Sequence, residues 1–185
     1  SCIFITGNQY DHRDILIYDN YFHNYSGSGI SLGTHNQILE NIKIFNNTFS
    51  NGGSGVTARS WGTYAKLPNN VDISYNNLNN MSYGLQLTLV GGTGFLVHNN
   101  TIENTTYGIK IMGSSRSTHN LTVERNSIES QINSIVYACG VFDADLRIKK
   151  IQNKTILSNT LTISKDTWDG EDLFYNNTVY SSKNE

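Results

Sequence analysis

The segment IKIFNNTF at residues 42–49, followed by GVTAR at residues 55–59, recurs in altered form along much of the chain. Its apolar and polar residues alternate, which is typical of half-buried β-strands. One apolar residue stands three positions before Asn47 and another stands two positions after it. Asn is common where a chain turns, so we expect Asn47 to mark a corner between two strands. The segment therefore predicts one unit of a repeat built from short strands.

Each repeat contributes one Asn at a shared position, with spacings of 27, 29, 24, 26 and 33 residues. A second strand begins 8 or 9 residues after the Asn in five of the repeats. The shared residues are Asn20, Asn47, Asn76, Asn100, Asn126 and Asn159, and the second strands are 29–33, 55–59, 84–88, 108–112 and 134–138. This period predicts a parallel β-helix whose turns stack about 4.8 Å apart. Asn tolerates the left-handed conformation, and stacked Asn side chains can hydrogen-bond along the axis.

The composition excludes several classes of protein. The net charge of -2 and the pI of about 6.2 are unlike those of a protein that binds nucleic acid through phosphates. No apolar run is long enough to span a membrane. The 25 Asn residues, together with many Gly, Ser and Thr, disfavour long helices. An all-β protein with many turns remains.

The Asn ladder and the strands that begin with Gly resemble the pectin lyase-like right-handed parallel β-helix superfamily, over about residues 1–165. The resemblance implies an all-β, right-handed parallel β-helix (a solenoid) of about six coils, with residues 166–185 irregular or forming a partial coil. It also implies an extracellular or surface location and carbohydrate-related activity, although the fold alone does not select one function. Since residues 2–7 read as a strand in mid-coil, we expect the sequence to be a fragment of a longer chain.

In the superfamily the substrate groove follows the column of second strands, which here carries Ser31, Thr57, Gln86 and Lys110 at outward positions. None of these positions holds Asp or Glu as far as Met112. Glycosidases need two carboxylates and calcium-dependent lyases need several oxygen ligands. The sequence therefore argues against both mechanisms, and we expect no metal and no cofactor. Cys2 and Cys139 are about five turns, roughly 24 Å, apart, too far to form a disulfide.

A lyase that works without metal must neutralise a sugar carboxylate and remove the neighbouring proton. The candidate catalytic residues are Arg59 and Lys110 as cations, with His35 or Tyr64 as the base. The alternative is that Arg59 and Lys110 are two separate solvated side chains on an exposed sheet.

Sugar rings bind well to aromatic side chains, and two Tyr-Gly pairs recur at one position of the repeat. The candidate substrate-binding residues are Trp61, Lys66, Tyr83, Gln86 and Tyr107. Three of the site candidates, Trp61, Tyr64 and Lys66, lie in the long loop 59–70, where we would place a site. The stacked tyrosines can equally be a stabilising ladder.

The leading hypothesis is an extracellular protein that binds or cleaves a polysaccharide, with metal-independent elimination as its catalytic form. The alternative is a non-catalytic surface module, such as an adhesin or a phage tailspike segment. The expected partners are a polysaccharide and either the remainder of a longer chain or further copies of this one. We expect no nucleic acid partner and no membrane insertion.

Overall fold

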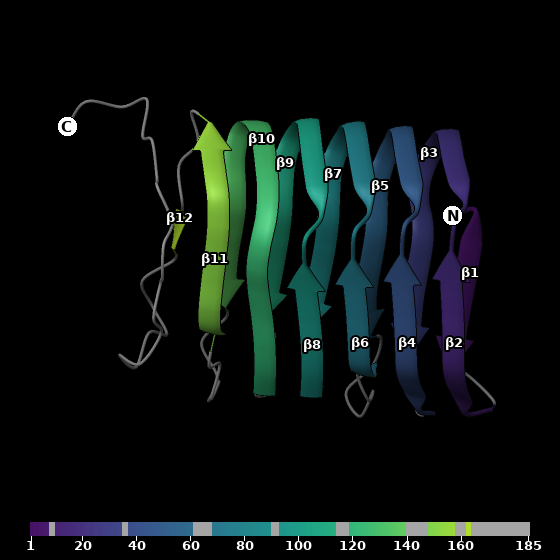
Figure 1. Ribbon diagram of the computed structural model, residues 1–185. Helices are drawn as coiled ribbons and strands as arrows, with labels where there is room; N and C mark the ends of the chain where they lie inside the picture. Colours follow the sequence, from purple (N-terminus) through teal and green to yellow (C-terminus); the bar gives the residue numbers. More distant parts are fainter. Residues whose placement is uncertain are drawn as a thin grey trace.

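A computed structural model describes residues 1–7, 10–34, 37–60, 68–89, 93–113, 119–139, 148–157 and 162–163 of the 185. All the regular elements in these ranges are β-strands (Figure 1). None of the described elements is a helix long and apolar enough to cross a membrane. The strands are β1 (Ile3–Gly7), β2 (His12–Tyr18), β3 (Tyr21–Thr34), β4 (Leu39–Phe45), β5 (Thr48–Ser60), β6 (Asn69–Ser74), β7 (Asn77–Leu89), β8 (Thr93–His98), β9 (Thr101–Gly113), β10 (His119–Cys139), β11 (Ile148–Leu157) and β12 (Thr162–Ile163).

The strands pair in parallel to form one 12-stranded sheet. The sheet winds around the core, so that it has two faces. One face stacks β2, β4, β6 and β8 on the first part of β10, and the other stacks β1, β3, β5, β7 and β9 on its second part. Figure 1 shows β2, β4, β6 and β8 side by side at the front, with the longer strands β3, β5, β7 and β9 curling over behind them. Because every pairing is between successive turns of the chain, the fold is the expected parallel β-solenoid.

The number of coils is slightly lower than expected. About four turns have parallel neighbours on both sides, and they begin with β3, β5, β7 and β9. The prediction of about six also counted the end strands β1–β2 and the segment around β11. The fold itself is confirmed, while the expected irregular segment, residues 166–185, lies entirely outside the described part of the chain.

The apolar positions of the repeat form the core, as the sequence predicts. Ile44, Phe49 and Val56, one from each strand position of a single repeat, are fully buried. The equivalent residues of the other described turns are also buried, namely Ile17, Ile73, Val97 and Val123, then Phe22, Leu78, Ile102 and Ile128, then Ile30, Leu85 and Ile109. Each such side chain contributes about 1.5–3 kcal/mol by leaving water. Phe22 and Phe49 also stack, with ring centroids 4.8 Å apart.

The predicted Asn ladder is present inside the solenoid. The side-chain amide of each Asn donates to Oδ1 of the Asn one turn later, at 2.9–3.1 Å, from Asn20 through Asn47, Asn76 and Asn100 to Asn126. The backbone N–H of each Asn donates to the same oxygen. The last four members are at most 1% exposed. The ladder therefore satisfies polar groups that the corner would otherwise bury unpaired.

Asn159, which the sequence assigned to this position, lies outside the described residues. The register of β10 and β11 contradicts the assignment, because it pairs Asn126 with Asn153, and Ile128 with Ile156. Register shifts lie on both sides of Asn126, so the apolar spacing around Asn153 departs from that of the other repeats.

The left-handed residues are the neighbours of the ladder Asn and not the ladder Asn itself. Asp19, Asn46, Tyr75, Asn99 and Arg125, each directly before a ladder residue, have φ of 53–56°. Two further left-handed positions recur in each turn, at Asp14, Asn41 and Asn70 and at Asn24, Asn51, Asn80 and Asn104. The excess of Asn therefore has two causes, since one column needs an amide and the others need a residue that tolerates positive φ.

The short strand that follows each ladder Asn and the strand that begins with Gly form one continuous strand with a bend. β5 and β7 pair from Thr48–Asn77 through to Ala58–Leu87, with Gly55 and Gly84 near the bend. A Cβ atom on Gly84 would lie 2.6 Å from the carbonyl oxygen of Gly108 and 2.7 Å from Cγ2 of Ile102. Gly occupies this position because the next turn of backbone passes too close for any side chain.

Candidate functional site

The outward side of β7 and β9 carries a group that we call the tyrosine platform, formed by Tyr83, Tyr107 and Lys110. Tyr83 and Tyr107 are register partners, and their rings stack with centroids 5.1 Å apart and planes 10° apart. The ammonium group of Lys110 lies 5.2 Å from the Tyr83 centroid and 6.0 Å from the Tyr107 centroid. Both distances are within the range of a cation–π interaction. Repetition of Tyr-Gly on successive turns thus produces a stacked pair with a positive charge held against it.

The predicted outward column is only partly accessible. Thr57 Oγ1 lies 3.1 Å from both Ser28 Oγ and Ser31 Oγ. Ser31 and Thr57 are at most 3% exposed, so this end of the column is closed. Gln86 and Lys110, which follow Thr57 on the next two turns, are half-buried and form the open part. Gln86 has no side-chain hydrogen bond among the described residues.

Arg59 is not part of the tyrosine platform. It pairs with Gly33 near the end of β5, two turns before Lys110, and lines a shallow cavity of about 440 Å³ with Ser1, Phe4 and Ser31. Lys110 instead lies against the tyrosine rings. The structure therefore places the two predicted cations in separate surroundings on the same face.

The other predicted site residues lie outside the described part of the chain. They are the candidate bases His35 and Tyr64 and the loop residues Trp61 and Lys66. Of the nine predicted site residues, Tyr83, Gln86, Tyr107 and Lys110 are brought together and Arg59 is apart.

The register confirms which residues form the outward column and shows no carboxylate there from Ser31 to Lys110. Glu103 is on β9 itself but lies before the bend, opposite Asn79. No cluster of three or more His, Cys, Asp or Glu residues occurs in the described ranges. The accessible chemistry of the described column and the adjacent tyrosines is therefore amide, phenol and ammonium.

His98 is held by neighbours on both ring nitrogens. Its Nε2 lies 3.2 Å from Oδ1 of Asp72, and its Nδ1 lies 2.8 Å from Nδ2 of Asn99. The ring of Tyr75 meets it edge-on, with centroids 5.6 Å apart. These contacts fix the imidazole at the corner of the turn, so we assign His98 a structural role.

Residues 2–149 match the family model described as the right handed beta helix region. The chain belongs to the right-handed β-helix family. This membership supports the resemblance to the pectin lyase-like superfamily and is compatible with carbohydrate-related roles. No curated protein and no solved structure shows a significant match to the chain.

Sequence reasoning missed the outer row of Asn residues on this β-helix, namely Asn24, Asn51, Asn80 and Asn104. These residues follow the buried ladder by four positions, and neighbours in the row hydrogen-bond at 3.3 Å and 2.7 Å. The signal was present, because Asn recurs four residues after Asn20, Asn47, Asn76 and Asn100. It was assigned to the corner alone.

Tyr25 lies near the bend of β3, and its role was likewise not predicted from the sequence. Its ring covers Gly52 on the next turn, and its hydroxyl lies 3.7 Å from the sulfur of Met81 one turn further. Burial raises the pKa of the Tyr25 phenol above its ordinary value of 10.0, and the nearby Cys2 thiol adds to the effect.

Proposed function

We propose that this β-helix protein binds an acidic polysaccharide on the outward face of β7 and β9, outside the cell or at its surface. The stacked Tyr83 and Tyr107 rings with Lys110 against them carry the proposal. Aromatic rings pack against the C–H faces of sugars, and an ammonium group attracts a carboxylate. Gln86 adds free amide groups for sugar hydroxyls beside Lys110.

An acidic ligand is favoured over a neutral one at the platform because of the charges around it. Lys110 is positive, and no Asp or Glu lies in its column on the described turns before it. A uronate carboxylate would meet little repulsion there, and at a partly buried site its attraction to Lys110 is screened less than in open water.

A catalytic form of the proposal is elimination without metal. A base would remove the proton α to the uronate carboxylate, the C–O bond to the leaving sugar would break, and a C=C bond would form. Lys110 or Arg59 would neutralise the carboxylate, and His35 or Tyr64 would be the base. The separation of Arg59 from Lys110 favours binding over catalysis, so binding is the primary proposal.

The test measures binding of oligogalacturonate and oligoalginate to the protein by calorimetry at two salt concentrations. Lys110→Gln keeps the length of the side chain and removes its charge, so it should weaken binding at least tenfold and reduce the salt dependence. Tyr83→Leu should weaken binding similarly. Tyr18→Leu is the matched control, because Tyr18 and Phe45 form an equally close stack (5.1 Å, 8°) on the opposite face.

Equal affinity of the Lys110→Gln and wild-type proteins for every acidic oligosaccharide contradicts the proposal. The same samples, followed by ultraviolet absorbance, decide the catalytic form. Absence of an unsaturated product with and without calcium removes the lyase hypothesis and leaves the binding proposal in place.

A further inference from the structure

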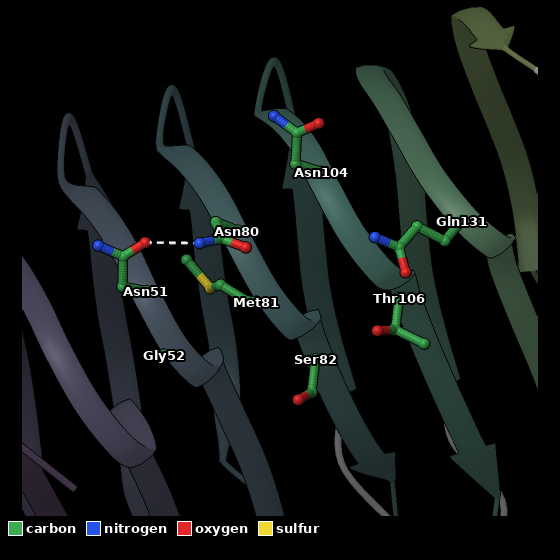
Figure 2. A pocket seen from close by; sticks show the side chains of 8 residues that line it. All are labelled: Asn51, Gly52, Asn80, Met81, Ser82, Asn104, Thr106 and Gln131. Atoms are coloured by element: carbon green, nitrogen blue, oxygen red, sulfur yellow. Dashed lines mark hydrogen bonds between the residues drawn. The ribbon is translucent and has the colours of Figure 1, made fainter.

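A second polar surface lies beside the platform, where the outer row of Asn residues crosses the bends of β5, β7 and β9. It is a shallow groove of about 340 Å³, which we call the amide groove. Its polar side chains are Asn51, Asn80, Ser82, Asn104, Thr106 and Gln131. Figure 2 shows them on four neighbouring strands, from β5 to β10. Three strand spacings give the groove a length of about 14 Å.

The outer row stops hydrogen-bonding to itself within the groove. Asn51 Nδ2 donates to Asn24 Oδ1 at 3.3 Å, and Asn80 Nδ2 donates to Asn51 Oδ1 at 2.7 Å. Within the described chain Asn104 makes no such bond to Asn80, and Figure 2 draws only the Asn51–Asn80 bond. The buried ladder, in contrast, continues on the same turns through Asn100 and Asn126.

A register irregularity lies one turn after the break. The pairing of β9 with β10 shifts between Ile128 and Ser130 and again between Ser130 and Asn133. Thr105 and Ser130, paired at this place, are buried, and neither hydroxyl has a partner among the described residues. The row of side-chain hydrogen bonds therefore ends between β7 and β9, and the regular pairing beneath the groove is interrupted between β9 and β10.

The interruption leaves unused polar groups on the surface. Among the described residues the side chains of Asn104, Thr106 and Gln131 make no hydrogen bond, and neither does Ser82. Together they offer amide donors, amide acceptors and hydroxyl groups that can act as either. None of the residues that line the groove is charged. Such a surface matches a neutral ligand rich in hydroxyl groups, because each sugar hydroxyl can both donate and accept.

The groove and the platform are neighbours along two strands. Ser82 precedes Tyr83 on β7, and Thr106 precedes Tyr107 on β9. A chain that leaves the tyrosine rings in the direction of Asn80 and Asn104 therefore enters the groove directly. We propose that the amide groove binds neutral sugar units of the same polysaccharide, so that the ligand is a mixed glycan with both acidic and neutral residues. The mixed ligand rests on the proposed function, while binding of neutral sugars in the groove can be tested separately.

The experiment titrates the protein with neutral gluco-, xylo- and galacto-oligosaccharides and, separately, with oligogalacturonate. Gly tolerates the φ of 51° at position 104, so Asn104→Gly removes the side-chain amide without backbone strain. Thr106→Val removes the hydroxyl group and keeps the shape of the side chain. Each should weaken binding of a neutral oligosaccharide at least tenfold. Asn41→Gly is the matched control, because Asn41 is also left-handed (φ 56°) and its side chain hydrogen-bonds, among the described residues, only to Asp14 and Asn70, which do not line the groove, so the affinity of this variant should be unchanged. Thermal unfolding verifies that each variant is folded.

The outcomes separate the two proposals. Neutral oligosaccharides that bind the wild-type protein and lose affinity in Asn104→Gly support the groove. Lack of any effect of Lys110→Gln on oligogalacturonate binding contradicts the platform, whatever the neutral sugars do. If oligogalacturonate is the one oligosaccharide that binds, and its binding depends on Lys110, the result supports the platform and overturns the groove. The groove proposal is also overturned if none of the neutral oligosaccharides binds. It is overturned as well if Asn104→Gly weakens the binding of extended peptides but not the binding of sugars.

Discussion

Asn47 donates two hydrogen bonds to a single oxygen of Asn76, one from its backbone N–H at 3.0 Å and one from its side-chain amide at 3.1 Å. Asn76 in turn donates to the carbonyl of Ile44 at 2.9 Å and repeats both bonds to Asn100. Each rung therefore satisfies the corner of one turn with the side chain of the next. This arrangement makes the side chain of a buried rung a partner of two neighbouring turns.

Asn76→Ala should be strongly destabilising. It removes the acceptor for two Asn47 donors and the donor to Ile44, and the site is 1% exposed, so water cannot replace them. Unpaired buried groups cost about 1–3 kcal/mol each, and we expect a loss of about 2–4 kcal/mol because Asn47 retains other bonds. Urea unfolding measures the change.

Asn20→Ala is the control for that prediction. Asn20 is the exposed end of the ladder, and its backbone N–H still donates to Asn47 after the change. The expected loss is below about 1 kcal/mol. Equal losses in the two variants would contradict the view that burial makes the ladder strong.

Gly84→Ala should also be destabilising. The added methyl group would lie 2.6 Å from the Gly108 carbonyl oxygen, and a backbone atom cannot turn aside. We expect a loss of about 1–3 kcal/mol, as for an overpacked core. Gly27→Ala is the matched change, because its methyl group would meet only the N-terminal nitrogen of Ser1 at 3.5 Å. A larger loss at Gly27 than at Gly84 would refute this account of the bend.

Tyr75→Asn should stabilise the protein. Tyr75 has a φ of 54°, at a position where other turns have Asp19, Asn46 or Asn99, and a bulky residue is unfavourable in this conformation. Relief of about 1 kcal/mol should exceed the loss of the edge contact with His98. A rise in Tm measures this, and Asn46→Ala at the equivalent position should lower it. A lower Tm for Tyr75→Asn would show that the His98 contact dominates.

The repeat could be predicted from sequence because its columns depend on one property each. Burial selects Ile44 and its equivalents, and the buried amide selects Asn47 and its equivalents, so both recur at nearly constant spacing. The register failed at Asn159, where shifts around Asn126 alter the spacing of the apolar residues. The columns of left-handed residues were harder to recognise, because one of them contains Tyr75 and Arg125 where the other turns have Asn or Asp.

The site was predictable only where it follows the repeat. Tyr83 and Tyr107 were expected to stack because they share a position on successive turns, and they do. The contact of Lys110 with both rings depends on the path of its side chain, which spacing does not determine. The amide groove depends on a hydrogen bond that fails to form between Asn80 and Asn104, and both residues look like ordinary members of the row.

Tyr25 should make the protein sensitive to alkali. Its pKa in the folded state is raised above 10.0 by burial, so the folded state holds the phenol proton more tightly than the unfolded state does. The contribution is therefore complete below pH 10 and is lost as the pH rises above it. Urea unfolding at pH 8 and pH 11 should show a smaller loss of stability for Tyr25→Phe than for the wild-type protein. Tyr10→Phe, which removes a phenol that is 72% exposed, should keep the wild-type loss. If Tyr25→Phe and the wild type lose equal stability, deprotonation of Tyr25 does not limit the alkaline stability of the solenoid.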